Sequence, residues 1–209
     1  YQFTAGAITI DLVAGTVSGA EGNDTLSSIE RITGGDGDDS LLGDSGNNYL
    51  QGAGGNDTLD GGAGDDEIEA FYGDDSLLGG EGSDRVVYGS VSGSVTVDLA
   101  AGTSSGATGL DTLSSIENVI GSQFFNDSIL GDAQGNTMDG WGGDDTLLGG
   151  AGNDTLLGNT GNDSILAGSG DDSISGGAGA DWISYAHASG AVTLDLAATI
   201  PNARGAEGN

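Results

Sequence analysis

The sequence has no cysteine, no lysine, a single histidine (His187) and a single proline (Pro201). Without cysteine the chain can form neither disulfides nor thiolate metal sites, and one histidine gives no support to a zinc site or a nucleophile–histidine pair. No apolar run approaches the roughly 18 residues that a membrane-spanning helix needs, and the first residues lack the basic start of a secretory signal peptide. We therefore expect no membrane insertion, and we expect His187 to be a surface residue.

Positive charge is also nearly absent. Three basic residues stand against 33 acidic residues, which gives a formal net charge of -30. Such a surface repels the phosphates of nucleic acids and of anionic membranes. The charge therefore argues against nucleic acid as a partner and indicates cations instead.

The chain does not begin with Met, and its last residues, Gly205–Asn209, repeat the sequence of Gly19–Asn23. In the earlier copy Asp24, Thr25 and Leu26 come next, so the second copy stops in the middle of the motif. We therefore expect the sequence to be a segment of a longer repetitive protein.

Glycine is abundant, with 43 residues, and this composition together with high negative charge is typical of disordered chains. A nine-residue period argues against disorder. Six nonapeptides run from Gly34 to Val87, and a ten-residue variant, GSQFFNDSIL (121–130), precedes six more that end at Ser184. In every unit an aliphatic residue stands two positions after an Asp or Asn, namely Leu41, Leu50, Leu59, Ile68, Leu77, Val86, Ile129, Met138, Leu147, Leu156, Ile165, Ile174 and Ile183.

A longer element separates the two blocks of nonapeptides. Segments 8–12, 95–99 and 192–196 alternate apolar and polar residues, which predicts half-buried strands. After the first two comes a further loop of the nonapeptide kind, GAEGNDTLSSIERI and GATGLDTLSSIENVI. The chain therefore divides into a strand-and-loop element (1–33), a block of six nonapeptides (34–87), a second strand-and-loop element (88–120), a second block (121–184) and the start of a third, truncated unit (185–209).

The residue types within one nonapeptide predict a metal site. Glycines let the backbone turn tightly and expose its carbonyl oxygens, and the Asp at the sixth position adds a carboxylate. Carbonyl and carboxylate oxygens are hard ligands that suit calcium, whereas magnesium demands a stricter octahedron. The aliphatic eighth residue is expected to point inward from a three-residue strand, with Ser40, Thr58, Glu67 and Ser76 at the seventh position pointing outward.

These units resemble the GGxGxDxUx nonapeptide of the RTX (repeats-in-toxin, haemolysin-type) calcium-binding family. GGDGDDSLL, GGAGDDEIE, GGAGNDTLL and GGAGADWIS match the pattern fully, whereas AFYGDDSLL and GSQFFNDSIL depart from it most. The resemblance implies an all-β fold, a right-handed parallel β-roll (β-solenoid) with calcium bound in the turns. Two nonapeptides would form one coil, and each ion would lie between loops one coil apart.

The resemblance also implies which residues bind the metal. The sixth-position carboxylates are Asp39, Asp57, Asp66, Asp75, Asp84, Asp127, Asp145, Asp154, Asp163, Asp172 and Asp181. Asn48 and Asn136 occupy the same position, and their pairs with Asp66 and Asp154 are expected to be poorer sites because an amide oxygen carries no charge. Paired across one coil, these residues would hold about seven to nine calcium ions.

Other residues allow more than one interpretation. Asp24 and Asp111 lie in isolated loops, where each could be a ligand or a solvated turn residue. Aromatic residues interrupt the repeats, Trp141 and Trp182 among them, and these could cover the roll or bind a glycan. Acid–base catalysis needs two carboxylates in different environments, and the carboxylates here are repeated and equivalent, so the segment is not expected to be an enzyme.

The sequence therefore predicts a calcium-dependent structural module of a secreted or cell-surface repetitive bacterial protein, such as an adhesin stalk, a surface-layer protein or a filament. The expected partners are calcium and other copies of the same chain in an extracellular assembly. The resemblance to the family also implies export by type I secretion, followed by folding in calcium outside the cell. The alternative is the C-terminal accessory region of a secreted enzyme or pore-forming toxin, and the sequences that flank the segment would distinguish the two.

Overall fold

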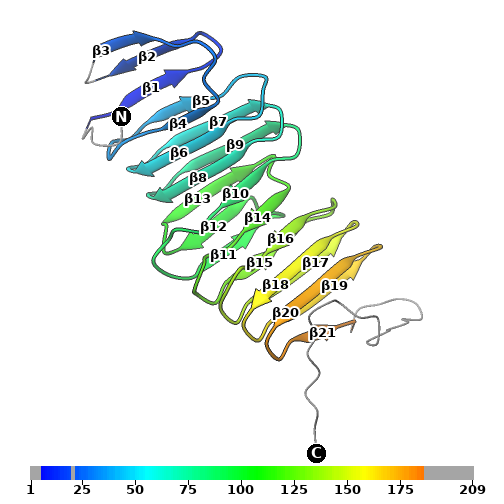
Figure 1. Ribbon diagram of the computed structural model, residues 1–209. Helices are drawn as coiled ribbons and strands as arrows, with labels where there is room; N and C mark the ends of the chain where they lie inside the picture. Colours follow the sequence, from blue (N-terminus) through cyan, green and yellow to red (C-terminus); the bar gives the residue numbers. More distant parts are fainter. Residues whose placement is uncertain (1–5, 20–21, 186–209) are drawn as a thin grey trace, which may run out of the picture.

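The computed structural model describes residues 6–19 and 22–185, and in these residues the chain forms strands and loops without any helix. No helix long and apolar enough to cross a membrane is therefore found among them. The strand predicted at 192–196, His187 and Pro201 lie outside the described residues, as does nearly all of the predicted third unit. Successive coils stack along one axis, from β3 at one end to β21 at the other (Figure 1).

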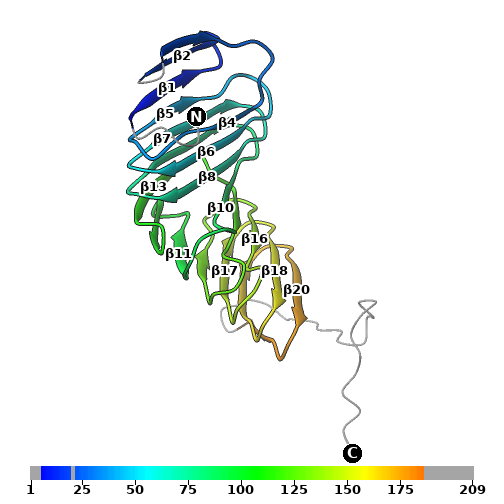
Figure 2. The same cartoon turned by 60° about the vertical axis from the view of Figure 1, so that its left-hand side comes forward.

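The strands form two sheets that face each other across the stack (Figure 2). The first sheet has 13 strands: β1 (Ile8–Asp11), β2 (Thr16–Gly19), β3 (Gly22–Thr25), β5 (Ser40–Leu42), β7 (Thr58–Ala63), β9 (Ser76–Glu81), β11 (Val95–Asp98), β12 (Thr103–Gly106), β13 (Leu110–Ser114), β15 (Ser128–Leu130), β17 (Thr146–Ala151), β19 (Ser164–Ser169) and β21 (Trp182–Ser184). The second sheet has 8 strands: β4 (Arg31–Thr33), β6 (Tyr49–Gly54), β8 (Glu67–Tyr72), β10 (Arg85–Val87), β14 (Asn118–Ile120), β16 (Thr137–Asp139), β18 (Thr155–Thr160) and β20 (Ser173–Ala178).

Within each block the strands pair in parallel with the strand one coil further along the chain. In the first sheet Leu59 is level with Leu77, and in the second Leu156 is level with Ile174, so each coil consists of two nonapeptides. Consecutive nonapeptides alternate between the two sheets. The predicted parallel β-solenoid is confirmed.

The core is a ladder of the aliphatic residues at the eighth position. Eleven of the thirteen, from Leu41 to Ile165, have exposed fractions of 2% or less, and Ile174 and Ile183 in the last coil are half-buried. The seventh-position residues Ser40, Thr58 and Ser76 are exposed, as expected for alternation along a strand. Each coil therefore buries one aliphatic side chain from each sheet, and burial of each is worth about 1.5–3 kcal/mol.

The strands are longer than the sequence predicts. Eight of them span 6 residues rather than three, because the first half of each following loop also pairs with the loop one coil on, as Gly62 does with Gly80. The backbone turns between the two halves at the second loop position, where even Ala53, Phe71 and Trp141 have positive φ. The prediction of three-residue strands is therefore wrong for the middle of each block.

The longer elements are three-stranded units built into the first sheet. Strands β1 and β11 show the predicted alternation of burial, and each is followed by two antiparallel strands, β2–β3 and β12–β13. The sequence does not predict β2 and β12, since TVSG and TSSG lack a run of strand-forming residues. Behind the second unit, Tyr88 is buried and its hydroxyl lies 2.8 Å from the Ser104 hydroxyl.

Candidate metal sites

The sixth-position residues form two rows, one along each side of the solenoid, because the loops that precede the two sheets lie on opposite sides. The row before the strands of the first sheet contains Asp39, Asp57, Asp75, Asp127, Asp145, Asp163 and Asp181. The row before the second sheet contains Asn48, Asp66, Asp84, Asn136, Asp154 and Asp172. Every sequence-predicted site residue therefore lies in one of two stacks.

Neighbours within a row are in direct contact. The backbone N–H of Asp57 donates to Oδ1 of Asp75 at 2.7 Å, and the backbone N–H of Asp145 donates to Oδ1 of Asp163 at 2.9 Å. The same contact joins all nine predicted pairs, Asp39–Asp57, Asn48–Asp66, Asp57–Asp75, Asp66–Asp84, Asp127–Asp145, Asn136–Asp154, Asp145–Asp163, Asp154–Asp172 and Asp163–Asp181. The structure thus brings together each pair that the sequence selects.

The second oxygen of these carboxylates is buried without a hydrogen-bond partner. This holds for Oδ2 of seven residues, Asp57, Asp66, Asp75, Asp84, Asp145, Asp154 and Asp163, whose exposed fractions are 2% or less. A buried charge without a partner is among the costliest features a folded chain can carry. Seven repetitions of it in two rows require a common explanation.

Near four of the unpartnered oxygens, those of Asp66, Asp84, Asp154 and Asp163, a glycine leaves open a gap that also borders a backbone carbonyl. A Cβ built on Gly61 would overlap both Oδ2 of Asp66 and, at 2.7 Å, the carbonyl oxygen of Gly79 in the next coil. The same arrangement surrounds Gly158, where a Cβ would meet Oδ2 of Asp163 and, at 2.6 Å, the carbonyl oxygen of Gly176. Oxygen atoms from two coils therefore converge on a space without side chains.

The electrostatics of the rows disfavour a cation-free state. Burial, together with a smaller effect of neighbouring carboxylates, raises the pKa of Asp57 to about 6 and the pKa values of Asp75 and Asp145 to about 7. Burial likewise raises the pKa values of Asp66, Asp84, Asp154 and Asp163. A divalent cation beside these oxygens would favour the ionised form and offset the repulsion.

The donor set fits calcium. Within residues 6–19 and 22–185, no three carboxylate or imidazole side chains converge, so each site would combine two carboxylates with carbonyl oxygens and water. Six to eight oxygens in an irregular shell are what calcium accepts, whereas zinc prefers nitrogen and sulfur. The role of such a site would be structural, because the ion would join two coils whose carboxylates otherwise repel each other.

The first residue of each run of contacts already has a hydrogen-bond partner for the side-chain oxygen that would face an ion. Oδ2 of Asp39 accepts the N–H of Gly35 at 2.6 Å, and Oδ2 of Asp127 accepts the N–H of Ser122 at 2.5 Å. The side-chain oxygen of Asn48 accepts the N–H of Asp44 at 2.7 Å. These contacts, together with the missing charge of the two Asn residues, make the outer sites weaker candidates than the interior ones.

Two further residues join the rows: Asp111, which the sequence leaves open as either a ligand or a solvated turn residue, and Glu117, which it does not select. Asp111 is buried, and its Oδ1 accepts the backbone N–H of Asp75 at 3.1 Å, so it extends the first row by one coil. Glu117 extends the second row, with Oε2 accepting the N–H of Asp84 at 2.9 Å. The signal was the recurrence of DTLSSIE at 24–30 and 111–117, which places both residues at fixed positions in a repeated element.

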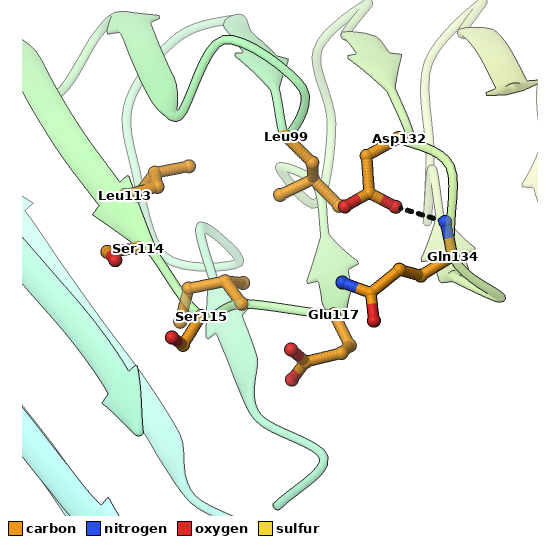
Figure 3. Close-up of a pocket in the computed structure, with 8 residues that line it drawn as sticks. Leu99, Leu113, Ser114, Ser115, Glu117, Asp132 and Gln134 are labelled. Atoms are coloured by element: carbon orange, nitrogen blue, oxygen red, sulfur yellow. Dashed lines mark hydrogen bonds between the residues drawn. The ribbon is translucent and has the colours of Figure 1, made fainter. Parts of the chain in front are cut away.

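Glu117 also lines a shallow pocket where the loop after β13 meets the loop after β15 (Figure 3). The carboxylate of Asp132 accepts the backbone N–H of Gln134 at 2.8 Å there, and Leu99 and Leu113 also line the pocket. Neither carboxylate is among those with a buried unpartnered oxygen, so the pocket adds none to the rows.

Replacing Asp145 tests whether one carboxylate serves two ions. Asp145 contacts both Asp127 and Asp163, so Asp145→Asn should weaken two sites and lower the free energy of unfolding in millimolar calcium by about 2–4 kcal/mol. Asp144→Asn removes the same charge from an exposed neighbour and should change stability by less than about 0.5 kcal/mol. Urea denaturation at fixed calcium measures both variants, and equal stabilities would contradict the shared-ligand arrangement.

Comparison with known proteins agrees with this geometry. A family model described as the RTX calcium-binding nonapeptide repeat matches the chain in four copies, at residues 33–68, 51–86, 124–156 and 157–185. Together these copies cover more than half of the chain and contain both rows of carboxylates. No match was found among curated proteins.

Proposed function

Because the chain belongs to the RTX calcium-binding nonapeptide repeat family, and is therefore a calcium-binding repeat module, we propose that it is a structural segment of a secreted or cell-surface bacterial protein that folds when it meets calcium outside the cell. The observation that carries this proposal is the pair of rows in which seven buried carboxylate oxygens lack partners, four of them beside a backbone carbonyl. The ligands proposed are the eleven sixth-position Asp residues.

The proposed number of ions, seven to nine, follows from the pairs. Nine divalent ions would change the net charge from -30 to about -12. If each site has the affinity of about 0.1–1 mM typical of extracellular modules, several-millimolar calcium contributes on the order of 1–2 kcal/mol per site. Over nine sites this is comparable to the entire stability of a typical domain, roughly 5–15 kcal/mol.

The affinity range also supports the proposed compartment. Sites of this class remain empty at the submicromolar calcium of a cytosol and fill at the millimolar calcium outside cells. An unfilled chain with repelling rows would stay extended, which is the state that type I secretion requires. The same argument supports the finer proposal of secretion by that route.

The duplication of a whole three-stranded unit favours a structural role in a repetitive protein over a role as the accessory region of an enzyme or toxin. The units β1–β2–β3 and β11–β12–β13 share the same registers, and the coils that follow each are built alike. Repetition of a whole element of this size suits an extended stalk, layer or filament. The alternative, an accessory region of a secreted enzyme or toxin, would be favoured by a catalytic or pore-forming domain beside this segment.

A calcium titration of the metal-free chain tests the proposal. Far-UV circular dichroism should report a cooperative gain of strand content with a midpoint at about 0.1–1 mM free calcium. A chain already folded at about 0.1 µM calcium, or still unfolded at about 10 mM, would contradict the proposed switch.

A further inference from the structure

A second series of hydrogen bonds runs beside each row of candidate calcium ligands. It is formed by the residue just before the sixth position, which we call the fifth-position residue. The backbone N–H of Asn56 donates to Oδ1 of Asp38 at 2.8 Å, and the backbone N–H of Asn162 donates to Oδ1 of Asp144 at 2.7 Å. The same contact joins nine pairs, which we call the fifth-position ladder: Asp38–Asn56, Asn56–Asp74, Asp74–Leu110, Asn126–Asp144, Asp144–Asn162, Asn162–Ala180, Asn47–Asp65, Asp65–Ser83 and Asn153–Asp171.

The two neighbouring series of bonds run in opposite directions. In the sixth-position rows an N–H group donates to the carboxylate of the coil that follows, as Asp145 does to Asp163. In the fifth-position ladder an N–H group donates to the side chain of the coil that precedes, as Asn162 does to Asp144. Two adjacent residues of one loop therefore bind the next coil through two opposed bonds. These bonds align the loops of neighbouring coils without the participation of an ion.

The surroundings of the two series also differ. The sixth-position carboxylates of the interior coils are buried, and seven of them have an unpartnered oxygen. The side chains of the fifth-position ladder are exposed, namely those of Asp38, Asn47, Asn56, Asp65, Asp74, Asn126, Asp144, Asn153, Asn162 and Asp171. Water can solvate the side-chain atoms of these residues that accept no N–H group. The ladder therefore has no buried oxygen that requires a cation.

The distribution of charge separates the two series most clearly. In the sixth-position rows, seven of the nine pairs have Asp on both sides. In the fifth-position ladder none of the nine pairs has Asp on both sides, and eight have Asp on one side and a neutral residue on the other. Asp is therefore stacked on Asp in the rows that have unpartnered oxygens and never in the exposed ladder.

We infer that the fifth-position residues position the calcium ligands, through a ladder that contains no cation and in which Asp alternates with neutral residues to keep like charges apart. The inference rests on the proposed function, because it assigns the ions to the sixth-position rows alone. Neighbouring strands lie about 4.8 Å apart, and two carboxylates at this separation repel each other even in water. Asn offers the same acceptor oxygen without the charge, so alternation preserves every bond of the ladder.

Asn162→Asp tests the alternation, because it places a carboxylate next to that of Asp144. The Nδ2 group of Asn162, which donates to Oδ1 of Asp144 at 3.1 Å, is also lost. In saturating calcium, urea denaturation should show a folding equilibrium constant about fivefold to tenfold below that of the parent. An unchanged equilibrium constant overturns the inference.

Two double variants of identical composition provide the matched comparison. Asn162→Asp combined with Asp144→Asn again pairs Asp with Asn, and its folding equilibrium constant should lie within about twofold of the parent's. Asn162→Asp combined with Asp171→Asn has the same net charge, but residue 171 lies on the other side of the solenoid, so the pair of carboxylates at 144 and 162 remains. This second variant should be as unstable as Asn162→Asp alone. Equal stabilities of the two double variants overturn the inference.

Screening and ion counting test the absence of a cation from the ladder. About 1 M sodium chloride, added in saturating calcium, should remove most of the difference between Asn162→Asp and the parent, because screening is effective for exposed charges. Equilibrium dialysis should find as many calcium ions on Asn162→Asp as on the parent, and fewer on Asp163→Asn, which replaces a proposed ligand. A difference that persists in salt, or an additional ion on Asn162→Asp, overturns the inference.

The outcomes separate this inference from the proposed function. A parent chain that does not fold in calcium overturns the proposed function. A parent chain that folds and binds calcium, with the two double variants equally stable, overturns only the role of the fifth-position ladder.

Discussion

Removal of calcium from the folded chain is expected to abolish nearly all of its strand content at neutral pH. Each coil stacks carboxylates on those of the next coil, and the unpartnered oxygens of the interior residues are buried. Without a cation these groups must either protonate or repel, and burial already raises the pKa values of Asp75 and Asp145 to about 7. Burial of the aliphatic eighth-position residues must then offset by itself both the repulsion and the conformational entropy that 43 glycines lose on folding.

Two control ions distinguish binding from screening. About 1 M sodium chloride shortens the screening length to roughly 3 Å and weakens repulsion between exposed charges, but it supplies no ligand for a buried oxygen. Magnesium at the same concentration as calcium has the correct charge but requires a smaller and stricter shell. Calcium should restore the circular dichroism spectrum, magnesium should restore little of it, and sodium chloride almost none. Full refolding in sodium chloride would show that screening, rather than site binding, stabilises the roll.

The second large effect is expected from a single methyl group in the loop. Gly55 has a φ of 110°, and a Cβ at this position would lie 2.5 Å from the carbonyl oxygen of Gly37 in the preceding coil and 2.9 Å from the backbone nitrogen of Asp38. The contact is with backbone atoms, which cannot move aside without separating the coils. The left-handed conformation adds about 1–2 kcal/mol and the overlap about 1–3 kcal/mol. Gly55→Ala should therefore lower the free energy of unfolding in calcium by about 2–5 kcal/mol.

The preceding residue is a matched control. A Cβ on Gly54 meets no atom within 4 Å, and Gly54 is not in the left-handed region. Gly54→Ala should change the free energy of unfolding by less than about 0.5 kcal/mol. Calcium-saturated thermal or urea denaturation of the two variants gives the comparison. Equal losses would mean that the loops do not stack as closely as the structure has them.

The nonapeptide period was sufficient to predict the solenoid, its core and the pairing of the carboxylates. The reason is that a repeat with one inward residue and one loop carboxylate has few ways to stack. Leu59 and Leu77, like Asp57 and Asp75, are level because the register of one coil sets that of the next. The repeat therefore carries long-range information that is absent from most sequences.

The features that could not be predicted are those that break the period. Strands β2 and β12 depend on pairing to β1 and β11 rather than on their own residues. Asp111 and Glu117 join the rows only because β13 and β14 return to the stack through a segment of different length. Positive φ at Ala53, Phe71 and Trp141 is likewise imposed by neighbouring coils, since these residue types do not favour it.

The central claim is that calcium joins coils by binding between sixth-position carboxylates. A crystal structure of the chain grown in millimolar calcium tests it most directly, through the anomalous signal of the bound ions. Ions are predicted in both rows, each in contact with two carboxylates one coil apart, such as Asp57 and Asp75 or Asp145 and Asp163, and with backbone carbonyl oxygens. A folded solenoid whose interior carboxylates are paired only with protein or water, with ions elsewhere on the surface, would contradict the account.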